Sequence, residues 1–269
     1  MSDRAARVRQ RLRAGLRRNA IAYATLAPVV RAFRELRHFR TRRTLRRYRA
    51  SLQHLADTVA RPVIVKVGAN DGVTRDPAAG VIADEPRWRG LFIEPVDYSF
   101  RQLEANFGED SRFVLANMAV GPERTTLPLF AMDPRFFDDT RERPPIAAQI
   151  SSFDRRHIDR HFNDVPPEMV RRIEVPVRPL DDLLDTYGFV EVHALQIDVE
   201  GYDLEALKTF DFTRFRPVCI YIEHKHLGDS DRASLRSLLK ANGYRIYHGA
   251  SDYCAIRSDA PTARPSRQG

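Results

Sequence analysis

Short apolar runs alternate along the chain with segments in which apolar residues recur at helical spacing. Residues 63–67 are apolar except for Lys66, a pattern typical of a buried strand in a parallel sheet. Similar runs predict further strands at 90–93, 113–120, 194–197, 218–223, 244–248 and 253–256, and a short return strand at 126–130. Helices are predicted at 40–60, 100–107, 180–186 and 235–242. This alternation predicts an α/β fold with a doubly wound Rossmann-like sheet, mostly parallel with a C-terminal antiparallel hairpin.

The first strand runs into a turn with two glycines, and the second strand ends at a carboxylate. Gly68 and Gly72 remove side chains where the backbone of such a turn approaches a ligand. Glu94 stands where doubly wound folds place an acid that accepts hydrogen bonds from ribose hydroxyls. The pair indicates a site for a cofactor that contains a nucleoside; the alternative is an ordinary strand-to-helix turn.

The residues between the two glycines narrow the choice of cofactor. A dinucleotide site takes Gly-x-Gly-x-x-Gly, whereas this turn lacks the middle glycine and places Asp71 near the expected pyrophosphate. A P-loop is excluded because no Gly-Lys-Ser/Thr follows. A cationic ligand without phosphate, such as S-adenosylmethionine, suits this turn better than NAD.

A chain of 269 residues has the length of one α/β domain with a sizeable core. Residues 131–170 are irregular and rich in Arg, Asp, Phe and Pro, which predicts a lid-like insertion over the carboxyl edge of the sheet. We expect the domain over residues 51–258 and a disordered tail at 259–269. Cys219 and Cys254 lie in apolar runs, as reduced core cysteines do, which favours a cytoplasmic protein.

The net charge of +8 is unevenly distributed. Residues 1–50 contain 16 Arg, no Lys and two acids, a charge of +14 that leaves −6 for the rest of the chain. We expect an Arg-rich helical extension that packs on the body or mediates association; a peripheral contact with an anionic membrane surface is the main alternative. Nucleic-acid binding is not favoured, because these basic residues lack interleaved aromatic residues for stacking. The apolar stretch at 21–30 is too short to span a bilayer.

Five short blocks together resemble the FkbM family of S-adenosylmethionine-dependent methyltransferases. The blocks are residues 67–72, 92–95, 117–119, 179–183 and 195–203, the last with the distinctive Ile-Asp-Val-Glu-Gly. The resemblance spans about residues 55–258 and implies the methyltransferase form of the doubly wound sheet. It also implies methylation of an oxygen, often a hydroxyl of a sugar or small metabolite. Where many members carry an acid that orients the amino end of the cofactor, this chain has Lys66, so Asp198 or Asn70 would have to replace it.

The resemblance and the strand ends nominate the residues that contact the cofactor. They are Gly68, Asn70, Asp71, Gly72, Glu94, Asn117 and Asp198. The glycine turn is expected at the methionine end and Glu94 at the ribose. Asn117 is expected near the adenine, or alternatively at a turn, where its side chain satisfies a backbone group.

A hydroxyl acceptor needs a base. We predict His224 first, because imidazole titrates closest to neutral pH, and Asp198 second. His226, His157 and His161 are predicted to lie on the surface or in the lid. No metal is predicted, although Asp198, Glu223 and His224 form an alternative site for a divalent cation that would acidify a bound hydroxyl.

The sequence thus predicts an O-methyltransferase that uses S-adenosylmethionine and acts on a hydroxyl of a glycan, a glycolipid or a small polyhydroxylated metabolite. The alternative from another class is a non-catalytic adaptor that docks through its Arg-rich arm. A nucleic-acid methyltransferase is not favoured, because the strand at 194–197 continues as Asp-Val-Glu-Gly rather than Asn/Asp-Pro-Pro-Tyr/Phe.

Overall fold

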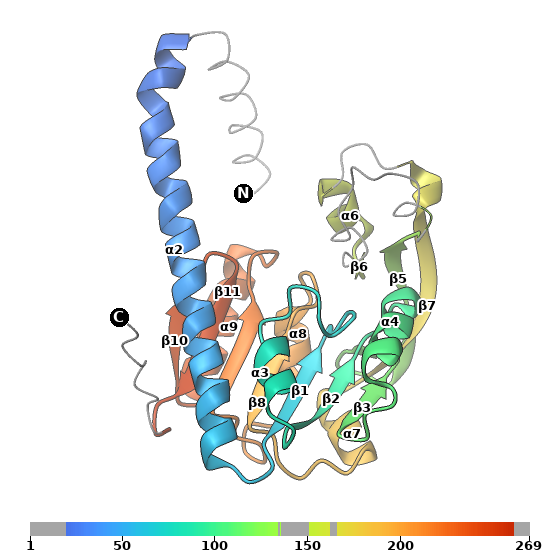
Figure 1. Ribbon diagram of the computed structural model, residues 1–269. Coiled ribbons are helices and arrows are strands. Elements are labelled where there is room, and N and C mark those ends of the chain that lie inside the picture. The colour runs from blue at the N-terminus through green and yellow to red at the C-terminus, as the bar shows by residue number, and fades with distance from the viewer. Residues whose placement is uncertain (1–19, 134, 136–150, 162–165, 261–269) are drawn as a thin grey trace.

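The centre of the molecule is a sheet of seven strands (Figure 1); the computed structural model describes residues 20–133, 135, 151–161 and 166–260. The strand order is β10-β11-β9-β8-β1-β2-β3. The parallel strands are β1 (Val63–Val67), β2 (Arg89–Ile93), β3 (Phe113–Ala116), β8 (Ala194–Ile197) and β9 (Cys219–Glu223). Antiparallel pairing of β11 (Asp252–Arg257) with β9 and with β10 (Tyr244–His248) completes one edge. The predicted doubly wound sheet with its C-terminal antiparallel hairpin is confirmed.

Helices cover both faces of this sheet, because each face is apolar. On one face lie α2 (Ala20–Thr58), α3 (Ala79–Asp84) and α4 (Asp97–Phe107), which bury side chains such as Leu52, Ile82 and Leu103. On the other face, α7 (Leu180–Thr186), α8 (Asp203–Lys208) and α9 (Asp229–Ala241) bury leucines against β1, β2, β8 and β9. The sheet is therefore the middle layer of three, and its interior consists of two apolar clusters.

A second, smaller sheet stands beside the first at its β3 side (Figure 1). It contains β4 (Ala119–Val120), β5 (Thr125–Met132), β6 (Ser151–Ser152) and β7 (Val170–Arg178), in the order β4-β7-β5-β6. The single strand predicted at 113–120 is wrong, because the chain turns after Ala116 and enters the second sheet at Ala119. The strand predicted at 126–130 exists, but it is longer and pairs with β7.

The predicted lid at 131–170 is described only in part. Its described elements are the end of β5, β6, α6 (Arg155–His161) and the 3₁₀ turn η2 (Pro167–Met169). Residues 134, 136–150 and 162–165 lie outside the described residues.

The Arg-rich segment continues into the body of the protein. Helix α2 passes residue 50, the predicted domain boundary, without a break. Its last turns bury Tyr48, Leu52 and Leu55 against the sheet. Residues 1–19 and 261–269 lie outside the described residues, so the predicted membrane contact and disordered tail stay predictions. Within the described part, none of the helices has the length and apolar character needed to cross a bilayer.

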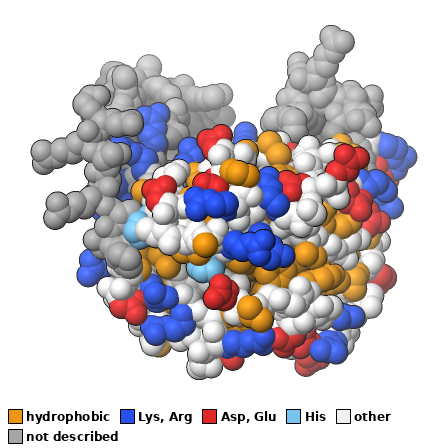
Figure 2. Space-filling view, turned by 60° about the horizontal axis from the view of Figure 1, so that its bottom comes forward, with side chains coloured by type: hydrophobic (Ala, Val, Ile, Leu, Met, Phe, Trp, Pro, Cys, Tyr) orange, Lys and Arg blue, Asp and Glu red, His pale blue; other side chains and the backbone are white. Residues whose placement is uncertain are grey.

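The amino-terminal side of the sheet carries mixed charge. In the view from that side, Lys and Arg side chains lie interspersed with Asp and Glu side chains (Figure 2). The predicted site residues lie instead at the opposite, carboxyl edge of the sheet.

Candidate active site

Register brings the predicted site residues together at the carboxyl edge of the sheet. Val67 at the end of β1 pairs with Ile93 of β2 and with Ile197 of β8. The residues that follow these three strand ends therefore lie side by side. The strand order reverses between β1 and β8, and at such a reversal open α/β sheets have a crevice in which they bind ligands. A cavity at this point is lined by Gly68, Asn70, Glu94, Asp198 and Glu200, together with residues from the second sheet.

The second sheet contributes a wall from β4, β5, β6 and the residue after β6. Ser151, Ser152 and Phe153 line the cavity. The ring of Phe153 packs edge-on against Tyr202, which follows β8, with 5.0 Å between the ring centroids. The cavity thus lies between the two sheets.

The glycine turn is set by a close approach of two strand ends. Gly68 has a φ of +76°, and a Cβ there would lie 1.9 Å from the carbonyl oxygen of Asp198. The amides of Gly68 and Ala69 both donate to the carbonyl of Ile93, at 2.9 Å each. Gly68 therefore allows β1, β2 and β8 to converge at the cavity floor.

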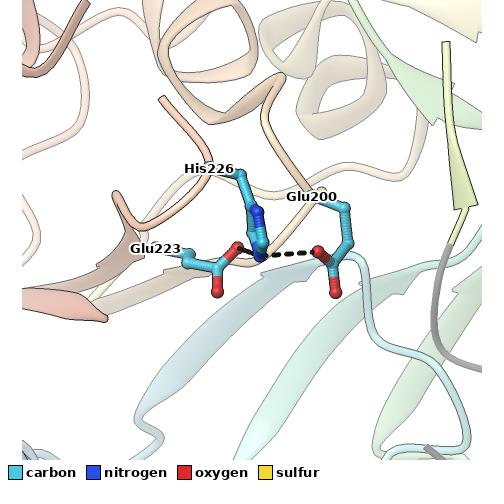
Figure 3. Close-up of side chains that lie close together, drawn as sticks. All are labelled: Glu200, Glu223 and His226. Carbon is cyan, nitrogen blue, oxygen red and sulfur yellow. Dashed lines mark ion pairs between the residues drawn. The ribbon is translucent and has the colours of Figure 1, made fainter. Parts of the chain in front are cut away.

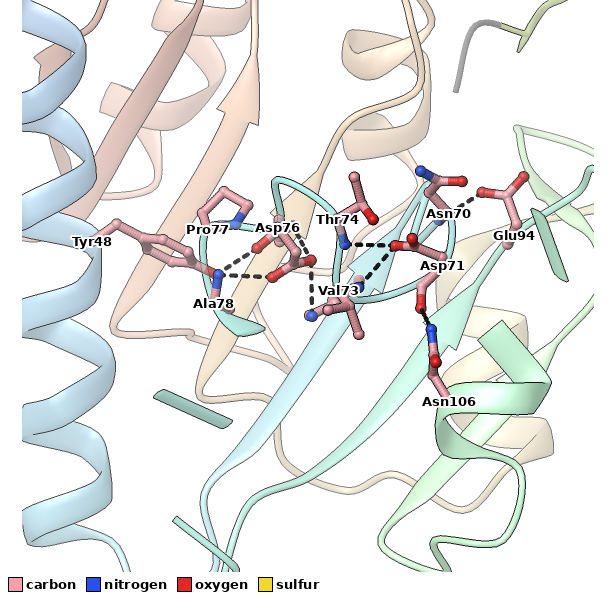
Figure 4. Close-up of polar contacts among 12 residues, drawn as sticks. Tyr48, Asn70, Asp71, Val73, Thr74, Asp76, Pro77, Ala78, Glu94 and Asn106 are labelled. Carbon is pink, nitrogen blue, oxygen red and sulfur yellow. Dashed lines mark hydrogen bonds and ion pairs between the residues drawn. The ribbon is translucent and has the colours of Figure 1, made fainter. Parts of the chain in front are cut away.

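Glu94 is a buried carboxylate of the cavity (Figure 4). One oxygen accepts the amide of Asn70 and the other the amide of Val96, both at 2.9 Å. Burial raises the pKa of Glu94 to about 7, although these two hydrogen bonds act in the opposite direction. Because each carboxylate oxygen can accept two hydrogen bonds, the group retains acceptor capacity toward the cavity.

The raised pKa of Glu94 makes a pH-dependent contribution to stability. The ordinary pKa of a glutamate is 4.5, so between pH 4.5 and about 7 the folded chain keeps a proton that the unfolded chain releases. The stabilisation by Glu94 is complete below pH 4.5. It decreases by about 3 kcal/mol in total as the pH rises from 4.5 through about 7. We expect the free-energy difference between wild type and Glu94→Gln, measured by urea unfolding, to change by this amount in favour of the variant. A pH-independent difference would contradict the assignment.

Lys66 does not face the cavity. Its side chain is 1% exposed, and its Nζ lies 2.9 Å from Oδ2 of Asp76 and 4.6 Å from the centroid of the Phe92 ring. Asp76 also accepts the amide of Ala78 at 2.7 Å and Nε2 of Gln196 at 3.1 Å. Asp76 and Gln196 line the cavity. This chain thus has Lys66 where the family has an acid, and the carboxylate of Asp76, ten residues later, pairs with that lysine. The sequence pattern did not reveal this pair.

The buried Lys66–Asp76 pair predicts a non-additive effect of mutation. Lys66→Met leaves the Asp76 carboxylate buried beside an apolar chain, and we expect a loss of about 3–5 kcal/mol of unfolding free energy. The double variant Lys66→Met/Asp76→Asn removes both charges and should recover most of that loss. Chemical denaturation of the four proteins of this cycle measures the coupling; simple additivity would contradict a direct pair.

Asp198 opens into the cavity from the end of β8. Its side chain is exposed toward the cavity, while the protein around it, followed by the charges of Glu200 and Asp203, raises the pKa of Asp198 above its ordinary value. Asp203 is itself buried and accepts the amides of Val199 and Gly201 at 3.2 and 3.0 Å. These bonds shape the loop that turns Glu200, whose φ is +53°, toward the carboxylates of neighbouring strands.

His224 does not reach the cavity, which corrects its predicted position. Its ring stacks on Tyr253 with 3.9 Å between centroids, and both ring nitrogens are shielded from solvent. Burial lowers the pKa of His224 to about 4. The reason is strand alternation: β9 ends at Glu223, and the next side chain turns to the opposite side, where β11 covers it.

His226, and not His224, lies beside the carboxylates at these strand ends (Figure 3). The prediction that His226 lies on the surface or in the lid is wrong, because its side chain is only 10% exposed. Its Nε2 lies 3.2 Å from Oε2 of Glu200 and 3.7 Å from Oε2 of Glu223. The alternative metal set with Asp198 and His224 is corrected likewise, since the residues that converge are Glu200, Glu223 and His226. The only sequence signal was the i,i+3 spacing of Glu223 and His226.

Three other predicted cofactor residues make contacts within the protein instead of lining the cavity. The Asp71 carboxylate accepts the amides of Val73 and Thr74 at 2.9 and 2.7 Å (Figure 4). Gly72 has a φ of +75°, and a Cβ there would collide with Phe107 of α4. Asn117 donates from Nδ2 to the carbonyl of Glu94 at 3.0 Å, as its alternative reading expected. The described cavity wall includes none of these three residues.

A doubly wound sheet with a glycine turn and a buried carboxylate at its carboxyl edge is typical of enzymes that bind a cofactor containing a nucleoside. The sequence profile of the Methyltransferase FkbM domain matches residues 66–246. The chain belongs to the FkbM family of S-adenosylmethionine-dependent methyltransferases, as the motifs predicted.

Similarity beyond the family is remote. No curated protein sequence matches the chain. Among solved structures, precorrin-6y C5,15-methyltransferase from Geobacter metallireducens GS-15 is 11% identical, with a TM-score of 0.38 over 77% of this chain and 86% of that chain. Fibrillarin from Aeropyrum pernix, solved with natively bound S-adenosyl-L-methionine, is 10% identical, with a TM-score of 0.36 over 79% and 75%.

Proposed function

We propose that the protein transfers the methyl group of S-adenosylmethionine to a hydroxyl oxygen of a glycan, a glycolipid or a small polyhydroxylated metabolite. The observation that carries this proposal is the placement of Asp198, a carboxylate with a raised pKa, in the same cavity as Glu94 and Gly68. A base is needed for a hydroxyl acceptor, and a carboxylate whose pKa is raised above its ordinary value holds a proton more readily than an ordinary carboxylate.

The residues present fit the cofactor. Glu94 would accept hydrogen bonds from the ribose hydroxyls with its remaining lone pairs, while Asn70 and Gly68 would border the methionine end. Asp76 would face the cofactor's amino group, because its carboxylate lines the cavity and is held by Lys66. The cofactor's positive charge suits a cavity whose polar wall is rich in carboxylates.

Bound S-adenosylmethionine supplies a methyl group whose carbon–sulfur bond breaks toward the positively charged sulfur. The protein's share is to align the acceptor oxygen, exclude water and take the hydroxyl proton. Asp198 would receive that proton. Phe153 and Tyr202 would shield the reacting groups, since their packed rings close the side of the cavity.

The test is methyl transfer from radiolabelled S-adenosylmethionine to panels of polyols, oligosaccharides and glycolipids, beside amines and carboxylic acids of similar size. We expect transfer to hydroxyl acceptors, and a decrease in kcat of about 100-fold in Asp198→Asn with little change in cofactor affinity. Asp159→Asn, an exposed carboxylate on α6, is the matched control. Transfer to nitrogen alone, or full activity in Asp198→Asn, would overturn the proposal.

A further inference from the structure

Three potential metal ligands converge at the edge of the cavity (Figure 3). Glu200 follows β8, Glu223 ends β9, and His226 belongs to the turn after β9. Their ligand atoms lie within 4.8 Å of one another. Glu200 also lines the cavity, so the cluster adjoins the space where the acceptor would bind.

The separations suit a single ion. With bonds of about 2.1 Å, the 3.2 Å between His226 and Glu200 subtends about 100° at the metal, and the 3.7 Å between His226 and Glu223 about 120°. Two such bonds span at most about 4.2 Å, so a shift of a few tenths of an ångström brings all three atoms into one coordination sphere. The remaining positions would face the cavity.

A second observation points to a ligand. Oε2 of Glu223 is buried and has no hydrogen-bond donor, and the side chain is only 10% exposed. The carboxylate of Glu200 lies in the same cluster, within 4.8 Å of the Glu223 ligand atom. Such a concentration of carboxylates is costly to bury unless a cation compensates it.

We propose that Glu200, Glu223 and His226 bind a divalent cation beside the acceptor end of the cavity. Two carboxylates and one imidazole form a mixed oxygen–nitrogen set, which suits Mn²⁺ or Zn²⁺ better than Ca²⁺. In the proposed methyl transfer, on which this role rests, the cation would bind the acceptor oxygen and acidify its hydroxyl, and Asp198 would take the proton.

The test is titration of the full chain with Mn²⁺, in which the paramagnetic resonance signal reports the ion that remains free. We expect one ion per chain with a dissociation constant of about 100 µM or lower, and a loss of affinity of about 100-fold or more in Glu223→Gln and in His226→Asn. Glu205→Gln removes an exposed carboxylate of α8 and should bind like the wild type. Equal binding by Glu223→Gln, or no binding by the wild type at millimolar Mn²⁺, would overturn the site.

The fold of the variants and the proposed function are tested separately. Glu223→Gln replaces a buried acid by a neutral residue of the same shape, so its melting temperature should not fall; His226→Asn provides a second, independent variant. Calorimetry with S-adenosylmethionine in the presence of EDTA then separates the two proposals. Cofactor binding without Mn²⁺ binding would refute the metal site alone, whereas Mn²⁺ binding without cofactor binding would refute the methyltransferase proposal alone.

Discussion

The Glu94→Ala variant is expected to bind S-adenosylmethionine about 1,000-fold more weakly than the wild type. A carboxylate that accepts two ribose hydroxyls forms two charge-assisted hydrogen bonds, each of about 1.5–3 kcal/mol. Their joint loss corresponds to two to four powers of ten in affinity. The amides of Asn70 and Val96 would also lose their acceptor, which loosens the turn that borders the ligand. Isothermal titration calorimetry with S-adenosylmethionine and S-adenosylhomocysteine measures the effect.

Glu104→Ala is the matched control for this experiment. Glu104 is exposed on α4 and does not line the cavity, so its removal also deletes a carboxylate but leaves the cavity wall unchanged. We expect unchanged affinity in this variant. If Glu94→Ala kept its fold, as judged by thermal unfolding, and bound the cofactor like the wild type, Glu94 would not be the ribose ligand.

The Gly68→Ala variant is expected to lose most of its folded population. A methyl group at this position would meet the carbonyl oxygen of Asp198 at 1.9 Å, which no side-chain rotation relieves because the obstacle is backbone. The left-handed φ of +76° adds a strain of about 1–3 kcal/mol for a residue other than glycine. Separation of β1 from β8 would relieve the collision and open the cavity floor. The expected result is a large fall in melting temperature together with loss of cofactor binding.

Gly80→Ala provides the contrast. Gly80 lies in α3, and a Cβ there would meet nothing within 4 Å. Alanine in a helix is more favourable than glycine by about 0.5–1 kcal/mol, so this variant should be slightly more stable. A similar destabilisation in both variants would show that close approach at the cavity floor is not the cause.

Local pattern was sufficient for the sheet and for part of the site. The central strands of the large sheet are buried on both faces and therefore appear in the sequence as short, mostly apolar runs, as Val63–Val67 and Cys219–Glu223 illustrate. Gly68 and Glu94 follow strand ends directly, and parallel strands deliver their carboxyl ends to one edge. Their presence in one cavity was thus predictable from the sequence by itself.

Only the tertiary structure decided which polar side chains meet beyond those strand ends. Strand β9 ends at Glu223. In the turn that follows, the ring of His224 packs on Tyr253, whereas the side chain of His226 reaches the carboxylate of Glu200. Lys66 lies on a strand face, and its partner Asp76 comes from a loop whose course no periodicity encodes. The same holds for the break after Ala116, which sends one apolar run into two sheets. Apolar period determines which residues are buried, whereas the partners of buried polar groups depend on loop geometry and long-range packing.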